Sequence, residues 1–301
     1  MPPSVGQMTN TLALDLPPEV RLVEGQGGLP CLHVDHQMAS GELYLDGATV
    51  TAWQPHGHDP VLWRSPQSQF VAGHPIRGGV PLCFPWFAAG PDGEQEPAHG
   101  FARIRRWELV SVTADPAGVQ IRCRLTDDAT SRQLWPHRFT ATYDVQLGQS
   151  LQMALTVRNT GSGPLTFEEA MHTYLAVGDV AGVSVHGLAR HPFVDKAGPE
   201  PERRAVEHRP LRIAGPVDRL YHQHAEAVHI TDANRTLTVG KAGSQTTVIW
   251  NPWAERAKQL SDLGDDDWPW FLCVESANAG PDTVSLGPGQ EHRMGTSIQV
   301  R

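Results

Sequence analysis

The chain has 301 residues, of which 40% are apolar, and its formal net charge is −9 with the histidines neutral. This length and apolar content predict one large domain with a buried core. The negative charge comes without a basic stripe or a nucleic-acid motif, which argues against DNA or RNA as a partner. We also expect no membrane association, because no stretch approaches the roughly 20 apolar residues that a spanning helix needs.

The N-terminal segment has no basic start followed by an apolar run, so the sequence predicts no secretory leader. We expect residues 1–20 to be a lead-in and residues 21–301 to form a single domain. The cysteines are Cys31, Cys83, Cys123 and Cys273. They lie far apart in apolar contexts, which is typical of reduced, buried thiols and not of a zinc ribbon. Reduced thiols favour a cytoplasmic location.

A His-Gly-His sequence at residues 56–58 has a spacing found in some β-barrel metal sites. No glutamate follows at a suitable distance, and glycine and proline surround the two histidines, so the pattern favours a surface loop. The pairs His172/His186 and His222/His224 also lack a carboxylate at ligand spacing, and no His-Glu-x-x-His helix is present. We therefore expect no metal site.

Residues 77–107 hold an unusual mixture of arginine, histidine, glycine, proline and aromatic residues. The charged and imidazole side chains of the segment are Arg77, His99, Arg103, Arg105 and Arg106. Arginine presents a planar fork to anionic oxygens, and Trp and Phe present flat faces to the C–H surface of a sugar. The segment thus predicts the wall of an anionic, carbohydrate-like ligand site. The alternative is a buried loop whose arginines form structural ion pairs.

Alternation of apolar and polar residues dominates the chain. Phe139–Leu147 and Leu151–Val157 alternate with a period of two, and Gly148-Gln149 between them predicts a β-hairpin. Similar short runs occur at residues 118–125, 228–231, 236–239, 246–250, 284–286 and 296–300. Helical periodicity is confined to residues 252–260, and residues 197–210 predict an exposed loop. Many strands with little helix predict an all-β fold, an antiparallel sandwich or barrel.

Two further segments place an ionisable residue in an apolar, strand-like run. They are residues 168–175, with His172, and residues 271–278, with Glu275. Burial of a glutamate without partners is costly, so Glu275 is either exposed at a sheet edge or functional. His172 alone is compatible with a satisfied core histidine. Together they form a candidate acid–base pair, in which a nearby carboxylate would hold His172 protonated while Glu275 stays ionised.

Other common site motifs are missing from the sequence. There is no Gly-x-Ser-x-Gly elbow, no P-loop and no Gly-x-Gly-x-x-Gly fingerprint, which argues against serine hydrolysis and nucleotide cofactors. The acidic run at residues 262–267 could attract calcium, but its spacing is not that of an EF-hand loop. We expect a solvated loop there.

A set of motifs occurs in a characteristic order along the chain. They are Arg77-Gly-Gly-Val-Pro-Leu-Cys-Phe-Pro-Trp-Phe, His99-Gly-Phe-Ala-Arg103, Met171-His172-Thr-Tyr174, Val217-Asp218-Arg-Leu-Tyr221, Trp250-Asn-Pro-Trp253 and Val274-Glu275. This order resembles that of the hexose-6-phosphate mutarotases (glucose-6-phosphate 1-epimerases) of the aldose 1-epimerase superfamily. The resemblance covers roughly residues 30 to 300. It implies a large antiparallel β-sandwich of the galactose mutarotase-like type, a monomer that acts without a cofactor on the anomeric carbon of a sugar phosphate.

The resemblance also implies roles for single residues. His172 would be the general acid and Glu275 the general base of ring opening. Two alternatives in function remain open: a general aldose mutarotase acting on free sugars, and a non-catalytic carbohydrate-binding protein on the same scaffold, which would not need both His172 and Glu275. A third alternative is a metal-dependent β-barrel sugar isomerase, which activity that survives a chelator would exclude.

The binding residues follow from the same motifs. Arg77 and Arg103 would hold the phosphate or nearby hydroxyls, and His99 and Asp218 would hold sugar hydroxyls. One position departs from the pattern: Ala98 stands before His99, where many relatives resemble Gln. Since alanine has no side-chain hydrogen-bonding group, the sequence predicts that one ligand contact is missing there.

Overall fold

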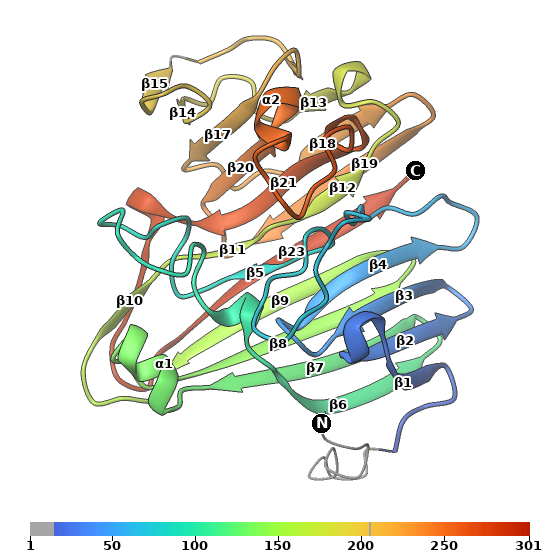
Figure 1. Cartoon of the computed structure of the whole chain (residues 1–301), viewed down its shortest axis with the longest axis vertical. Helices are drawn as coiled ribbons and strands as arrows, with labels where there is room; N and C mark the ends of the chain where they lie inside the picture. Colours follow the sequence, from blue (N-terminus) through green and yellow to red (C-terminus); the bar gives the residue numbers. More distant parts are fainter. Residues whose placement is uncertain (1–14, 205) are drawn as a thin grey trace.

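The structure, a computed structural model, describes residues 15–204 and 206–301. Residues 1–14 of the expected lead-in lie outside the described residues, and the first strand begins at Val20. The described part is built from antiparallel sheets of nine, eight, four and two strands (Figure 1). Within it, no helix has both the length and the apolar character needed to cross a membrane. The predicted all-β fold with little helix is confirmed.

Hydrogen bonding between neighbouring strands gives each large sheet its own strand order. The nine-stranded sheet is β16 (Leu211–Arg212), β13 (Ser184–His186), β18 (Val228–Asp232), β19 (Arg235–Ala242), β23 (Glu291–Val300), β9 (Leu151–Asn159), β8 (Phe139–Gly148), β7 (Gly118–Thr126) and β6 (Glu108–Asp115). The eight-stranded sheet is β15 (Glu202–Arg204), β14 (Phe193–Asp195), β17 (Val217–His222), β20 (Thr246–Asn251), β21 (Phe271–Asn278), β11 (Glu169–Met171) and β5 (Leu82–Cys83), with β12 (Tyr174–Ala176) also paired to β21.

The remaining elements are short or lie at the periphery. The four-stranded sheet is β1 (Val20–Glu24), β2 (Pro30–His36), β3 (Ala39–Tyr44) and β4 (Thr49–Pro55), and β10 (Leu165–Phe167) pairs with β22 (Val284–Leu286). The α-helices are α1 (Ala129–Leu134) and α2 (Trp253–Ala257). Single 3₁₀ turns are η2 (Gln26–Gly28), η3 (Ala102–Ile104), η4 (Val180–Gly182), η5 (Trp268–Trp270) and η6 (Gly280–Asp282).

The predicted hairpin is confirmed, because β8 and β9 pair from Phe139↔Asn159 to Leu147↔Leu151. The other alternating runs lie within β7, β18, β19, β20, β22 and β23. Two elements differ from the sequence expectation. The helix expected at residues 252–260 is only α2, after which the chain continues in i→i+3 turns. The loop expected at residues 197–210 contains β15, whose backbone pairs with the edge of β14 and so satisfies groups that would otherwise face solvent.

One face of the nine-stranded sheet is covered by the two other large sheets. β2 contacts β7, β3 contacts β8, and β21 contacts β23 (Figure 1). Trp53 of β4 is 1% exposed, and its indole N–H donates to the carbonyl of Gly148 at the end of β8, at 3.0 Å. A single core cluster includes Val50, Ile249 and Ile298, one from each sheet. One face of the eight-stranded sheet is therefore committed to the core.

The other face of the eight-stranded sheet is covered by the segment of residues 77–107. A small apolar cluster lies there, made of Cys83, Phe87, Ala170, Leu220, Val248, Ala277 and Ala279. Two glycines permit tight backbone contacts in this segment. Gly79 and Gly100 have φ values of +65° and +73°, and an added Cβ would lie 2.2 Å from Val50 O of β4 and 2.1 Å from Phe84 O of the same segment, respectively. No side chain fits at either position.

The cysteines give a direct test of the core. All are free and buried. Burial raises the thiol pKa of Cys31 and Cys123 to about 12, and raises those of Cys83 and Cys273 well above the ordinary value. Since the thiolate is the reactive form, a disulfide reagent such as Ellman's is expected to titrate no thiol in the native protein and all 4 after unfolding in guanidinium. Rapid reaction of a thiol in the native protein would contradict this arrangement.

Candidate active site

His172 and Glu275 face each other across neighbouring strands. The pairs on either side of them are Met171↔Ser276, between β11 and β21, and Tyr174↔Cys273, between β12 and β21. His172 lies in the gap between β11 and β12, and the continuous register places it opposite Glu275. Opposed side chains of an antiparallel pair share one face of the sheet. His172 Nε2 lies 3.5 Å from Glu275 Oε1. The sheet thus unites the two residues that the sequence singled out as an acid–base pair.

Both side chains of this pair are buried, with exposed fractions of 6% for His172 and 1% for Glu275. His172 Nδ1 and Glu275 Oε2 have no hydrogen-bond partner. The imidazole stacks on Tyr174, at 4.8 Å between ring centroids, and Trp250 stands edge-on to it at 5.7 Å. Because buried polar atoms normally find partners, the two free atoms mark a place suited to a ligand that supplies hydroxyl groups.

The charge state of the pair differs from the sequence expectation of an imidazolium beside a carboxylate. Burial, together with His99 and two nearby arginines, lowers the pKa of His172 well below its ordinary value. Burial and the nearby Asp218 raise the pKa of Glu275 well above its ordinary value. Burial disfavours both charged forms, so the surroundings favour a neutral imidazole beside a protonated carboxyl. The imidazolium–carboxylate pair and the neutral pair share the same number of protons. They differ only in whether one proton lies on His172 or on Glu275, and the environment sets its position.

His99 borders this pair, with 5.6 Å between its ring centroid and that of His172. Its backbone is in the left-handed region, at φ 64°. His99 Nδ1 accepts the backbone N–H of Ala88 at 3.3 Å and lies 3.3 Å from Cys83 Sγ. Burial, followed by the charge of Arg103, lowers the pKa of His99 to about 3, so the ring is neutral. Since Nδ1 accepts, the proton is assigned to Nε2, which can donate to a ligand.

The two arginines of the motifs have different partners. Arg77 donates from Nη1 to the hydroxyl of Tyr174 and from Nη2 to Asp262 Oδ1, both at 3.0 Å. Arg103 donates from Nη2 to the carbonyl of Ala98 at 2.7 Å. Ala98 thus binds Arg103 through its main-chain carbonyl, and this contact needs no particular side chain at position 98. Asp262 was expected in a solvated loop, and that expectation was wrong for this residue, because it forms a largely buried ion pair with Arg77.

Asp218 lies two strands away from Glu275 on the same sheet. It is opposite Trp250 of β20, which is opposite Cys273 of β21. Asp218 Oδ2 lies 3.7 Å from Arg256 Nη1. Burial raises the pKa of Asp218, although Arg256 and the nearby Lys196 oppose the rise. The carboxylate is placed at the side of the acid–base pair, where it can accept a hydrogen bond from a ligand.

Comparison with known proteins places this fold and site in a family. The sequence profile described as Aldose 1-epimerase matches residues 30–299. A protein of Escherichia coli (strain K12) named "Putative glucose-6-phosphate 1-epimerase" is 35% identical over 278 residues, which cover 90% of each chain. The chain belongs to the aldose 1-epimerase family. It is accordingly an isomerase of the epimerase class.

Further relatives of this epimerase agree in sequence and in structure. A protein of Cenchrus ciliaris with the same name is 34% identical over 268 residues, covering 84% of this chain and 78% of that protein. The crystal structure of a "putative mutarotase" from Salmonella typhimurium has a TM-score of 0.85 and 29% identity, covering 93% of this chain and 96% of that one. A galactose 1-epimerase from Lactobacillus acidophilus has a TM-score of 0.70 at 12% identity, which shows the shared fold alone.

Three aromatic residues of the segment 77–107 do not contribute to the sugar-binding wall that the sequence predicted. Trp86, Phe101 and Trp107 are 1–2% exposed and belong to the main core of the epimerase. A large aromatic ring gains more from burial than from partial solvation, which explains the difference. The partly exposed ring beside the acid–base pair is Trp250 of β20. This residue begins the motif Trp250-Asn-Pro-Trp253, from which no role for its ring could be derived.

Two arginines of the same segment are also excluded from the site. Arg105 pairs with Asp128, and Arg106 pairs with Asp46 at 2.8 Å. The sequence left open the alternative that the arginines of this segment form structural ion pairs. That alternative is correct for Arg105 and Arg106. The positive charge that acts on His172 comes from Arg77 and Arg103. Lys196, to which the sequence assigned no role, acts on the neighbouring His99 and Asp218.

Within the described residues, one group has the side chains to hold a metal ion: His191, His224 and Glu226. The sequence showed no such spacing, because His191 comes from a distant segment. His224 contacts Thr247 Oγ1 through Nδ1 at 2.8 Å and the carbonyl of Gly187 through Nε2 at 3.0 Å. Both ring nitrogens are therefore engaged, and a metal would have to displace the bond to Gly187.

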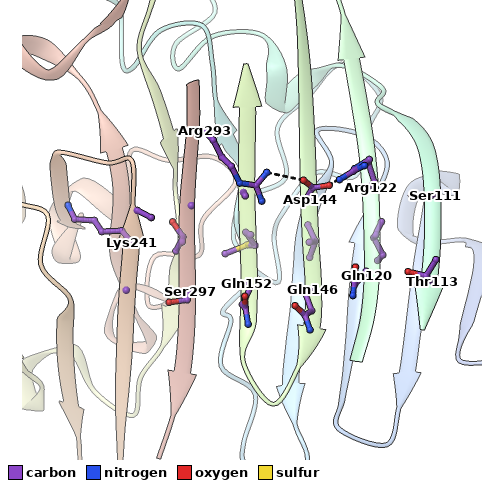
Figure 2. Close-up of a pocket in the computed structure, with 18 residues that line it drawn as sticks. Ser111, Thr113, Gln120, Arg122, Asp144, Gln146, Gln152, Lys241, Arg293 and Ser297 are labelled. Carbon is purple, nitrogen blue, oxygen red and sulfur yellow. Dashed lines mark hydrogen bonds and ion pairs between the residues drawn. The ribbon is translucent and has the colours of Figure 1, made fainter. Parts of the chain in front are cut away.

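A shallow hollow of about 570 Å³ lies elsewhere, on the solvent side of the nine-stranded sheet (Figure 2). Figure 2 shows Asp144 between Arg122 and Arg293, at 2.6 Å and 3.1 Å from them. Below them, glutamine and hydroxyl side chains form a row across the strands. None of the residues assigned to the acid–base site lines this hollow, and its single carboxylate, Asp144, is paired with two arginines, so we assign the chemistry to the buried pair.

Proposed function

We propose that this epimerase interconverts the α and β anomers of an aldohexose 6-phosphate, with glucose 6-phosphate as its substrate. The buried pair of His172 and Glu275, each with an unpartnered polar atom, carries the proposal. The names of the relatives from Escherichia coli and Cenchrus ciliaris support a phosphorylated hexose. The proposal includes a monomer with a single β-sandwich domain at residues 21–301, and the buried free cysteines support a cytoplasmic location.

In the proposed mechanism, Glu275 takes the proton of the anomeric hydroxyl while His172 gives a proton to the ring oxygen. The C1–O5 bond breaks and an open-chain aldehyde forms. Rotation about the C1–C2 bond presents the other face of the aldehyde, and the reverse proton transfers close the ring. One base and one acid on opposite sides of C1 suffice for this chemistry, and each contributes about 10²–10⁴-fold. Positioning of the sugar ring supplies the rest.

The electrostatics of the pair fit the exchange of roles. After ring opening, Glu275 holds the proton and His172 is neutral, which is the arrangement that burial favours. The ring-opening step needs the opposite arrangement. A bound phosphate would offset the positive charge of the nearby arginines and thereby raise the pKa of His172 toward the acid form. The phosphate would then contribute to catalysis as well as to binding.

The other site residues act in binding. His99 donates from Nε2 and Asp218 accepts, so both suit sugar hydroxyls. Arg77 and Arg103 hold the phosphate or the hydroxyls next to it. The partly exposed Trp250 can contact the C–H surface of the sugar ring. Together these groups surround the acid–base pair from the covering segment and from the sheet.

A comparison of two substrates tests the proposed function. Charge-assisted hydrogen bonds are worth roughly 1.5–3 kcal/mol each, so kcat/KM is expected to be more than about tenfold higher for glucose 6-phosphate than for free glucose. Polarimetry on the pure α anomers gives both values, once the spontaneous rate is subtracted. Equal values would indicate a general aldose mutarotase. Full activity in the presence of a chelator is the expected control, and its loss would favour a metal-dependent isomerase.

A further inference from the structure

The positively charged side chains at the site differ in how free they are to bind an anion. Arg77 forms an ion pair with Asp262, and the two side chains are 19% and 18% exposed. A carboxylate held at this distance offsets much of the charge that a phosphate would meet. Of the guanidinium nitrogens of Arg77, Nε is the one that is buried without a partner. A single N–H group suits a sugar hydroxyl better than it suits a phosphate dianion.

Arg103 and Lys196 differ from Arg77 in this respect. Neither has an ion-pair partner among the residues that the structure describes. Arg103 is bound to a neutral carbonyl, that of Ala98. Lys196 is half-buried, so its ammonium group is available at the border between the protein and the solvent. These two residues are therefore positive charges at the site that no carboxylate of the described residues holds in an ion pair, although the charge of Lys196 acts on Asp218.

Strand register directs the Lys196 side chain toward the site. Lys196 directly follows β14, and its backbone N–H donates to the carbonyl of Asp218 at 2.7 Å, which extends the β14–β17 ladder by one residue. Paired residues of neighbouring strands share a face, so Lys196 lies on the face of Asp218. The same face holds Trp250 of β20 and Glu275 of β21.

The electrostatic surroundings agree with this placement. Burial is the main cause of the lowered pKa of His99 and of the raised pKa of Asp218, and Lys196 acts on both groups. His99 belongs to the covering segment and Asp218 to the sheet. Lys196 is thus near both sides of the site, and Arg103, which also acts on His99, adds a second positive charge there.

We propose that Lys196 and Arg103 together bind the phosphate group of the substrate, and that Lys196 sets the preference for phosphorylated over free sugars. The inference rests on the proposed function and adds a residue that lies outside every motif of the sequence. Arg77 instead holds Tyr174 in place behind His172 and offers Nε to a hydroxyl of the sugar.

Kinetics of three variants test this inference with glucose 6-phosphate and free glucose. Lys196→Met is expected to lower kcat/KM for glucose 6-phosphate about tenfold, mainly through KM, because one charge-assisted contact is lost. The value for free glucose is expected to change less than about twofold, since only the phosphate contact is removed. Lys196→Arg should restore most of the loss. Lys258→Met is the matched control, because it removes the same charge from an exposed lysine that pairs with Glu255 at 2.8 Å.

The outcomes separate this inference from the proposed function. If the wild-type enzyme prefers glucose 6-phosphate and Lys196→Met keeps that preference, the role of Lys196 is refuted while the proposed function stands. Equal losses on both sugars would also refute it, since they would show a structural role. If the wild-type enzyme has no preference, the phosphorylated substrate itself is refuted, and the inference with it.

Discussion

Replacement of Glu275 by glutamine is expected to lower kcat for anomer interconversion by about 10²–10⁴-fold. Glutamine has nearly the shape of a protonated glutamate, which is the form that burial favours at this position, so the fold should tolerate it. The amide cannot take the proton of the anomeric hydroxyl, however, and ring opening loses its base. Polarimetry on α-glucose 6-phosphate, corrected for the spontaneous rate, measures the loss.

A second buried glutamate of the same region serves as the control for this experiment. Glu169 is fully buried on β11 and contacts Asn278 and His292, at 2.9 Å and 3.1 Å. Its side chain points to the opposite face of the sheet from Ala170, which pairs with Ala277 and so shares the face of Glu275. Glu169→Gln is expected to affect thermal stability and to leave kcat within about threefold of wild type, as for a change outside the reacting groups. A wild-type rate in Glu275→Gln would refute the proposed base.

The His172→Asn variant is the second with a large expected effect, again about 10²–10⁴-fold in kcat. Asparagine fills part of the space on Tyr174 but cannot protonate the ring oxygen. A matched control is His229→Asn, since His229 is exposed and bonded to Thr238 at 3.0 Å, outside the site. Wild-type activity of His172→Asn would show that another group supplies the proton.

The pH dependence of the wild-type enzyme tests the same pair. The active state holds one proton on His172 and Glu275 together. The pKa of His172 is lowered well below its ordinary value of 6.5, so the pair binds a second proton only at a pH well below 6.5. The fall of kcat/KM on acidification is therefore expected below pH 6.5. Because the pKa of Glu275 is raised, the first proton is retained to a pH well above the ordinary value of 4.5. An acid limb centred above pH 6.5 would contradict the lowered pKa of His172.

The fold could be predicted from the sequence because alternation records burial along each strand. β8 is buried at every second position up to Leu147, and its hairpin with β9 is local, so its register follows from the three-residue turn between Leu147 and Leu151. The same argument fails at β21, whose residues are all buried. No alternation remains there to show which face Glu275 occupies. The motif indicated that Glu275 matters, and only the sheet showed what it faces.

The sequence by itself determined the all-β class, the buried thiols and the residue types available for acid–base chemistry, because composition and local periodicity carry that information. The tertiary structure decided which of them meet. His172 faces Glu275 only because β11 and β12 both pair with β21. Asp262 offsets the charge of Arg77 from 185 residues away, and Lys196 lies on the face of Asp218 because β14 joins the sheet beside β17. Sheet order across long connections sets these contacts, and no local pattern encodes it.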